Sequence, residues 1–278
     1  MFYFLAVVGF VLGGLIGSFL NVVIYRVPRK LSIVSPPSAC PHCDHRIAWY
    51  DNVPVLSWLI LRGRCRHCSG RISPRYPLIE LGTAIAFALI VIARYDTIES
   101  SQNGAELASA ALVIVALLYL AAISIALAAI DLERSVLPNA IVLPAYVVGA
   151  VLLLGASILV GDWDAVVRAL IGAAALFVFY LVLALVYPGG MGFGDVKLAG
   201  VLGLYLAWLG WSALVVGAFA AFVLGGIVGL IIVVARRGSG KTRIPFGPWM
   251  IVGAWVGILW GAALASSYLR LFGLGGSS

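Results

Sequence analysis

Two aspartates stand where long apolar segments end or begin. Asp131 closes an apolar segment, and Asp195 lies in the glycine-rich stretch 190–197, GMGFGDVK. An ionisable side chain in such a place costs several kcal/mol to desolvate, about 2.5–3.5 kcal/mol on insertion scales at a helix centre. Residues of this kind are functional candidates by default, and two of them indicate a carboxylate pair.

Two carboxylates in one partly dry site cannot both ionise easily, so one keeps its proton while the other acts as a base. Such a pair activates water for amide hydrolysis. The ionised carboxylate takes a proton from the attacking water, and the protonated one donates to the developing oxyanion or to the leaving amine. The chemistry needs neither a nucleophilic serine nor a metal.

Two other interpretations of the aspartates stay open. In the first, Asp131 pairs with Arg134 and Asp195 pairs with Lys197 as ordinary helix-end charges. In the second, the aspartates form a proton or cation site of a transporter. The glycines near Asp195 fit a substrate cleft or a plain loop equally well. They are Gly189, Gly190, Gly192 and Gly194.

All four cysteines form two C-x-x-C pairs inside the polar stretch 26–76. The pairs are Cys40 with Cys43 and Cys65 with Cys68. Four thiolates at this spacing predict a closed, structural Cys₄ zinc site, which would hold a small segment folded. Disulfides or a redox pair are the alternative, but a reducing cytosol disfavours them. His42, His45 and His67 are expected to lie outside the ligand shell.

The composition is that of a membrane protein. Of the 278 residues, 63% are hydrophobic and only 10% are charged, whereas soluble domains are about a quarter charged. Glycines at positions 9, 13 and 17 in the first apolar segment predict close approach of another helix. The apolar segments long enough to cross a bilayer are 1–25, 77–95, 107–130, 140–160, 166–187, 213–235 and 247–269, with 196–209 as a shorter eighth.

The basic residues predict the orientation. With eight crossings and the amino terminus outside, only Arg94, Arg168 and Arg270 fall outside. The other basic residues fall on the cytoplasmic side, as the positive-inside rule requires. They are Arg26, Arg29, Lys30, Arg46, Arg62, Arg64, Arg66, Arg71, Arg75, Arg134, Lys197, Arg236, Arg237, Lys241 and Arg243. Both aspartates then lie at the cytoplasmic edge of the membrane and can meet.

The polar insert 26–76 combines nine basic residues with tryptophans in the stretch 49–58. This composition suits contact with anionic lipid headgroups and the membrane interface. Nucleic acid is the rival partner of a basic zinc module, but the tether between two membrane crossings argues against it. We therefore expect an all-α polytopic membrane protein of about eight transmembrane helices. It would comprise a first helix (1–25), a cytoplasmic Cys₄ zinc insert (26–76) and a peptidase core (77–278).

Several motifs, in this order and spacing, resemble those of the bacterial type IV prepilin peptidases. They are GSFLNVVIYR at 17–26, the two cysteine pairs, the stretch 49–58, RIS at 71–73, RYP at 75–77 with Glu80, Asp131 with LP at 137–138, GFGDVK at 192–197 and PFGP at 245–248. The resemblance covers nearly the whole chain. One departure is Asn139, where many members of that family have aspartate.

The resemblance implies a GxGD-type aspartic protease of the bacterial inner membrane, with Asp131 and Asp195 as the catalytic dyad. Its substrates would be prepilins or pseudopilins, cut at the cytoplasmic face after the glycine of a short basic leader, typically before phenylalanine. The resemblance also implies N-methylation of the new amino terminus with S-adenosylmethionine, whose binding residues it leaves unknown. A leader peptidase without methyltransferase activity is the alternative.

Overall fold

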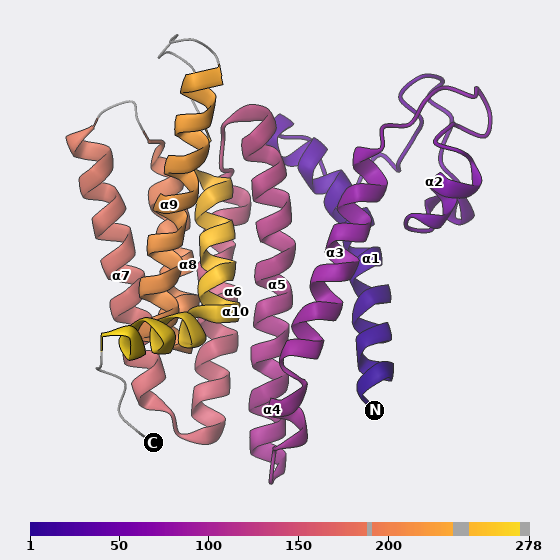
Figure 1. The fold of residues 1–278 in the computed structure, drawn as a ribbon. Coiled ribbons are helices and arrows are strands. Elements are labelled where there is room, and N and C mark those ends of the chain that lie inside the picture. The colour runs from indigo at the N-terminus through magenta and orange to yellow at the C-terminus, as the bar shows by residue number, and fades with distance from the viewer. Residues whose placement is uncertain (188–190, 236–244, 273–278) are drawn as a thin grey trace. The chain divides into compact units, whose positions relative to one another are not determined.

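The computed structural model describes the chain except for residues 188–190, 236–244 and 273–278 (Figure 1). Gly189, Gly190 and the basic run 236–243 of the sequence argument therefore lie outside the described residues. The described elements are all helical apart from two isolated β-bridges. They are α1 (Phe2–Arg26), η1 (Val27–Arg29), η2 (Trp49–Asn52), α2 (Leu56–Ile60), α3 (Arg75–Ala93), α4 (Tyr95–Glu99), α5 (Gly104–Arg134), α6 (Asn139–Val160), α7 (Trp163–Val186), α8 (Phe193–Leu209), α9 (Trp211–Ala235) and α10 (Gly247–Leu271).

Seven of the described helices are long and apolar enough to cross a membrane, and each coincides with a segment expected from the sequence. The expected eighth segment forms α8, which has 17 residues. At about 1.5 Å per residue α8 is roughly 25 Å long, slightly less than the hydrocarbon core of about 30 Å. Its residues from Val196 to Ala207, except for Lys197, are buried. It is thus the short, enclosed helix of the set.

The chain divides into two compact units, Met1–Ala129 and Ile130–Ser278. In the first unit, α1 packs closely on α3. A Cβ atom added at Gly13 would lie 2.6 Å from the Thr83 carbonyl oxygen and 2.7 Å from the Ala84 Cα. The expected close approach of another helix to the glycines of α1 is confirmed, and α3 is the partner.

The polar insert joins the helices of this unit through a buried carboxylate. The Glu80 Oε2 accepts a hydrogen bond of 2.7 Å from the backbone N–H of Val55. Val55 has φ +63°, and the Leu56 N–H bonds the Pro54 carbonyl across it at 2.6 Å. This is a γ-turn with positive φ, a rare and strained conformation for a β-branched residue. The carboxylate of α3 therefore holds a strained turn of the insert in place.

In the second unit, α8 packs against α6, α7, α9 and α10. Hydrogen bonds fix α8 to α6 at both ends: the Tyr146 hydroxyl donates to the Lys197 carbonyl (2.6 Å), and the Trp208 Nε1 donates to the Ser157 Oγ (3.0 Å). Figure 1 shows α10 running beside α8 and α9 before it turns aside toward its end. The glycine-rich helix with Asp195 is thus held from several sides.

Candidate active site

Asp131 and Asp195 are both buried within the second unit. Asp131 lies in the last turn of α5 and is 4% exposed, and Asp195 lies in the first turn of α8 and is 8% exposed. The two carboxylates are close enough to interact electrostatically. The structure therefore brings together the two residues that the sequence singled out.

The backbone of the glycine-rich stretch holds Asp195. Its Oδ2 accepts a 3.0 Å hydrogen bond from the Gly192 N–H, and its own N–H donates to the Gly192 carbonyl at 3.0 Å. These reciprocal bonds close the first turn of α8. They satisfy one carboxylate oxygen and an amide that a helix start otherwise leaves without an intrahelical partner.

Asp131 faces the start of α10. The backbone N–H of Gly247 interacts with its carboxylate, and a Cβ atom at position 247 would lie only 2.7 Å from the Asp131 Oδ2. Among the described residues this Oδ2 has no hydrogen-bond partner although it is buried. A buried, unpaired carboxylate oxygen is costly and calls for a functional explanation. It is the atom at which a water or a substrate group would bind.

Leu137 connects the surroundings of the two aspartates. Its side chain lies 2.9 Å from the position of a Cβ at Gly194 and 3.5 Å from that of a Cβ at Gly247. Gly194 precedes Asp195, and Gly247 touches Asp131. One leucine thus contacts both the start of α8 and the start of α10, next to the two aspartates.

The ordinary ion-pair interpretation of the aspartates finds no support among the described residues. Lys197 donates a 3.0 Å hydrogen bond from its Nζ to the Asn139 Oδ1, and its Nζ lies 4.7 Å from the centre of the Phe193 ring. Arg134 forms no ion pair with Asp131 in the described part of the chain. Among the described residues, neither carboxylate has a basic partner. This is what an acid–base pair of carboxylates requires.

A second site lies in the insert of the first unit. The four cysteine sulfurs lie within 4.8 Å of one another, and none of them is disulfide-bonded. A tetrahedral ZnS₄ centre with Zn–S bonds of about 2.3 Å has sulfurs about 3.8 Å apart, and the Cys40 and Cys68 sulfurs are 3.8 Å apart. The donor set fits a metal ion.

The two cysteine pairs are held by the same backbone pattern. Cys40 accepts from the Asp44 N–H and donates to the His45 carbonyl, and Cys65 accepts from the Ser69 N–H and donates to the Gly70 carbonyl. All four bonds measure 2.9–3.0 Å. Each pair thus sits on its own tight knuckle, and the metal would join the two.

The histidines of the insert are not part of the cysteine cluster. His42, His45 and His67 are exposed, and the rings of His45 and His67 stack with centres 3.5 Å apart. The His42 Nε2 instead contacts the Arg71 carbonyl oxygen at 3.2 Å. The four cysteines form the metal-binding cluster without a histidine.

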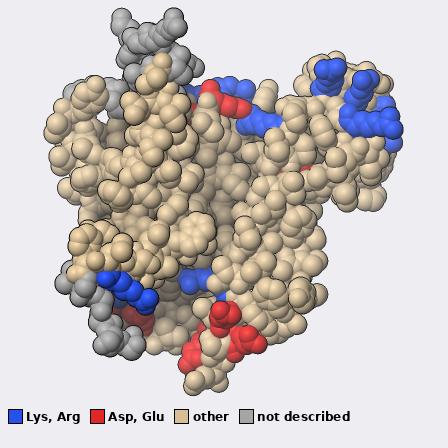
Figure 2. Space-filling view, in the orientation of Figure 1, with Lys and Arg blue, Asp and Glu red and all other residues tan. Residues whose placement is uncertain are grey.

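The insert also carries a basic, aromatic surface. Figure 2 shows lysine and arginine side chains gathered on the part of the chain that contains α2. The Arg66 guanidinium binds Asp51 through hydrogen bonds of 2.6 and 2.9 Å and lowers the pKa of that carboxyl. Because the folded pKa lies below the unfolded one, this pair stabilises the insert above pH 4 or so and is lost in stronger acid. Arg46 and Arg64 of the insert are also exposed and are available to a surface partner.

Two contacts of the active site escaped the sequence argument. The resemblance includes the PFGP motif at 245–248 but gives no role to Gly247, which lies against Asp131. Tyr180 of α7 is 2% exposed and interacts electrostatically with Asp195. No motif marks Tyr180, because an aromatic residue in an apolar helix is most often a packing residue.

Comparisons with known proteins cover both units. Residues 11–94 match the model of the bacterial peptidase A24 N-terminal domain, and residues 117–230 match that of the type IV leader peptidase family. A prepilin leader peptidase/N-methyltransferase of Pseudomonas putida is 37% identical over 95% of this chain and 93% of its own length. Proteins of the same name from Aeromonas hydrophila and Pseudomonas aeruginosa are 36% and 33% identical over more than nine-tenths of each chain. No solved structure matches the chain significantly.

Proposed function

The chain belongs to the type IV leader peptidase family, and from this premise we propose that it cleaves the leaders of prepilins with Asp131 and Asp195 as its catalytic dyad. The leader would be short and basic, and the cut would follow its final glycine. The proposal rests above all on one observation: two buried carboxylates interact in one site, and one of them keeps an unpaired oxygen.

The geometry supports a division of labour between the carboxylates. Asp195 is already bonded by the Gly192 N–H, whereas the Oδ2 of Asp131 is free to accept from a water molecule. When that water attacks the carbonyl carbon of the scissile bond, its proton passes to the ionised carboxylate. The protonated carboxylate donates to the carbonyl oxygen, and the amine then leaves with a proton from the dyad.

Replacing either aspartate with asparagine tests the dyad. We expect Asp131→Asn and Asp195→Asn to lower cleavage of a purified prepilin by about 10²-fold or more, because acid–base catalysis contributes roughly 10²–10⁴-fold. Asp164→Asn makes the same chemical change at an exposed position of α7 and should cleave normally. Near-normal cleavage by either dyad variant, with accumulation equal to the wild type, would make that aspartate structural.

N-methylation of the new amino terminus with S-adenosylmethionine is the second activity that we propose, since the relatives bear the name of both activities. We assign no residue to the methyl donor. Mass spectrometry of the cleaved substrate tests this activity. An added methyl group supports it, whereas an unmethylated amino terminus in the presence of the donor would indicate a leader peptidase without methyltransferase activity.

Cys40, Cys43, Cys65 and Cys68 are proposed to hold one structural zinc ion. All four coordination positions would be filled by thiolates, so the ion would have no open position for a reacting water. Its contribution would be to hold the insert folded. This assignment keeps the metal apart from peptide hydrolysis.

The protein is a multi-pass protein of the bacterial inner membrane, as its apolar helices and its relatives indicate. We propose that the active site and the zinc insert face the cytoplasm, which the distribution of basic residues supports. The partners would then be prepilins or pseudopilins and the lipids of the cytoplasmic leaflet. Nucleic acid is not among the proposed partners.

A further inference from the structure

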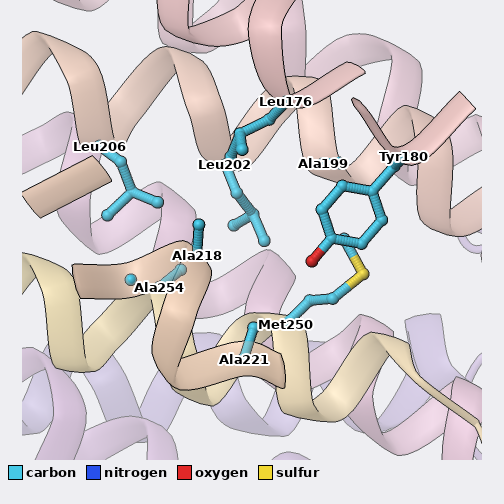
Figure 3. A pocket seen from close by; sticks show the side chains of 10 residues that line it. Leu176, Tyr180, Ala199, Leu202, Leu206, Ala218, Ala221, Met250 and Ala254 are labelled. Carbon is cyan, nitrogen blue, oxygen red and sulfur yellow. The ribbon is translucent and has the colours of Figure 1, made fainter. Parts of the chain in front are cut away.

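A narrow apolar cavity lies among α7, α8, α9 and α10 (Figure 3). Half of the residues that line it are alanine or glycine, namely Ala199, Gly217, Ala218, Ala221 and Ala254. The others are leucines, Met250 and Tyr180. The space therefore exists because small side chains stand where larger ones would fill the centre of the bundle.

The cavity begins one helical turn from the dyad. Along α8, Asp195 is followed at spacings of four and seven residues by Ala199 and Leu202 of the lining, which places them on one face of the helix. On α10, the lining residue Met250 comes three residues after Gly247, which touches Asp131. The first turns of α8 and α10 lie next to the two carboxylates, and the following turn of each helix lines the cavity.

Besides α8 and α10, a group of aromatic side chains also connects the cavity to the dyad. Tyr180 lines the cavity and interacts electrostatically with Asp195. Its ring packs against Phe222 and Phe246 with centres 5.5 and 6.1 Å apart. Phe246 in turn directly precedes Gly247. The dyad and the cavity therefore share one wall.

The chemistry of the lining selects an apolar group. Among the lining residues, the Tyr180 hydroxyl is the one polar side-chain group, and Figure 3 shows it pointing inward toward Met250. The cavity has room for about one water molecule, but apolar cavities of this kind stay dry. A larger group would enter if Met250 changed its rotamer, which an unbranched and flexible side chain does easily.

We propose that this cavity receives the apolar side chain of the substrate residue that follows the scissile bond. The inference rests on the proposed function: the residue before the bond is a glycine, which has no side chain to bind. The residue after it is the nearest group that could fill a space one turn from the carboxylates. Ala218 and Met250 would then determine which residue is accepted.

Two variants change the size of the cavity in opposite directions. Ala218→Leu fills it, and Met250→Ala enlarges it. Ala175→Leu is the matched control, since it adds the same atoms to an exposed position on α7. Each variant would be assayed with purified prepilins that carry Ala, Phe or Trp after the scissile bond.

We expect Ala218→Leu to lower kcat/KM for the Phe substrate about tenfold or more relative to the Ala substrate, because each methylene in an apolar subsite is worth roughly 10-fold or more. Met250→Ala should raise the Trp-to-Phe ratio of kcat/KM by a similar factor. Ala175→Leu should leave both ratios at the wild-type value.

The outcomes separate this inference from the proposed function. If both variants cleave all substrates with wild-type ratios, the cavity is a packing gap and the inference is overturned, while the peptidase stands. If the wild type cleaves no prepilin, the proposed function itself fails. Should Ala218→Leu fail to accumulate, the ratio measured with Met250→Ala decides, since that variant only removes atoms.

Discussion

Gly247 sets how closely α10 can approach the Asp131 carboxylate. Its backbone faces the carboxylate, and the position of a missing Cβ lies 2.7 Å from the Oδ2 and 3.5 Å from the Leu137 Cδ1. A Cβ at 247 would have to displace the carboxylate, whereas its distance to Leu137 is an ordinary van der Waals contact.

We predict that Gly247→Ala lowers kcat/KM for prepilin cleavage about 10- to 100-fold. The physical reason is that a displacement of about 1 Å in a catalytic group can reduce the rate by a factor of 10². Gly226→Ala serves as the control, because nothing lies within 4 Å of a Cβ at Gly226 of α9. Wild-type kinetics of Gly247→Ala would show that the contact does not position Asp131.

The residues of the site differ in how far the sequence reveals them. Asp131, Asp195 and the four cysteines stand out because carboxylates and thiols are rare in an apolar chain. Gly247 belongs to the PFGP motif and Tyr180 to no motif, but the roles of both come from contacts with residues that are distant in sequence. Lys197 illustrates the same limit: an ion pair with its sequence neighbour Asp195 was one open interpretation, but its amine bonds Asn139.

The insert and the helix pair α1–α3 depend on different interactions. The described insert has only the short helices η1, η2 and α2 before α3 begins, and two knuckles that meet at the cysteines. The helix pair has a close backbone contact at Gly13. We therefore expect loss of the metal to destabilise the insert, and a larger side chain at the contact to destabilise the helix pair.

Removal of the metal should unfold the insert. Structural zinc sites supply apparent binding free energies of about 10–16 kcal/mol, so Cys40→Ser or a strong chelator should release about one zinc per chain and expose the insert to trypsin. His45→Ala should keep the metal, because His45 is outside the cysteine cluster. Elemental analysis and limited proteolysis measure the two effects. An insert that resists trypsin without zinc would contradict the prediction.

Two glycine substitutions should change stability in opposite directions. Gly13→Ala forces a Cβ to within 2.7 Å of α3 backbone atoms, and overpacking typically costs about 1–3 kcal/mol. Gly82→Ala meets nothing within 4 Å and gains up to about 1 kcal/mol of helix propensity. Thermal unfolding in detergent should show a lower Tm for the first variant only. If Gly13→Ala had the Tm of the wild type, α1 and α3 would be able to move apart at this contact without a cost in stability.

The helices were predictable from apolar length, because a segment that crosses lipid must satisfy all its backbone hydrogen bonds internally. The expected and observed bounds of the seven long helices differ by a few residues. Most of the 17 residues of α8 are buried by other helices, and hydropathy does not distinguish such a helix from a membrane crossing.

The distribution of basic residues predicts the orientation of the chain in the membrane. The chain has a formal net charge of +7, and with eight crossings almost all basic residues fall on one side. With α8 not crossing, the basic run 236–243 would fall on the opposite side from the others. The positive-inside rule therefore favours a crossing by α8.

Reporters attached after Ser278 test the number of crossings. With the amino terminus outside and eight crossings, the carboxyl end is also outside, so alkaline phosphatase should be active there and green fluorescent protein should stay dark. The same reporters placed in the insert after Arg46 should give the reverse pattern. A fluorescent carboxyl-terminal fusion would contradict eight crossings and would indicate seven.

The strained turn at Val55 has a practical consequence for anyone who purifies the protein. Such a conformation stores about 1–3 kcal/mol when a side chain is present, but glycine adopts a positive φ without that penalty. Val55→Gly would keep the backbone N–H that bonds Glu80 while releasing the strain, against the loss of a half-buried side chain. Position 55 is therefore a rational starting point for engineering a longer-lived sample.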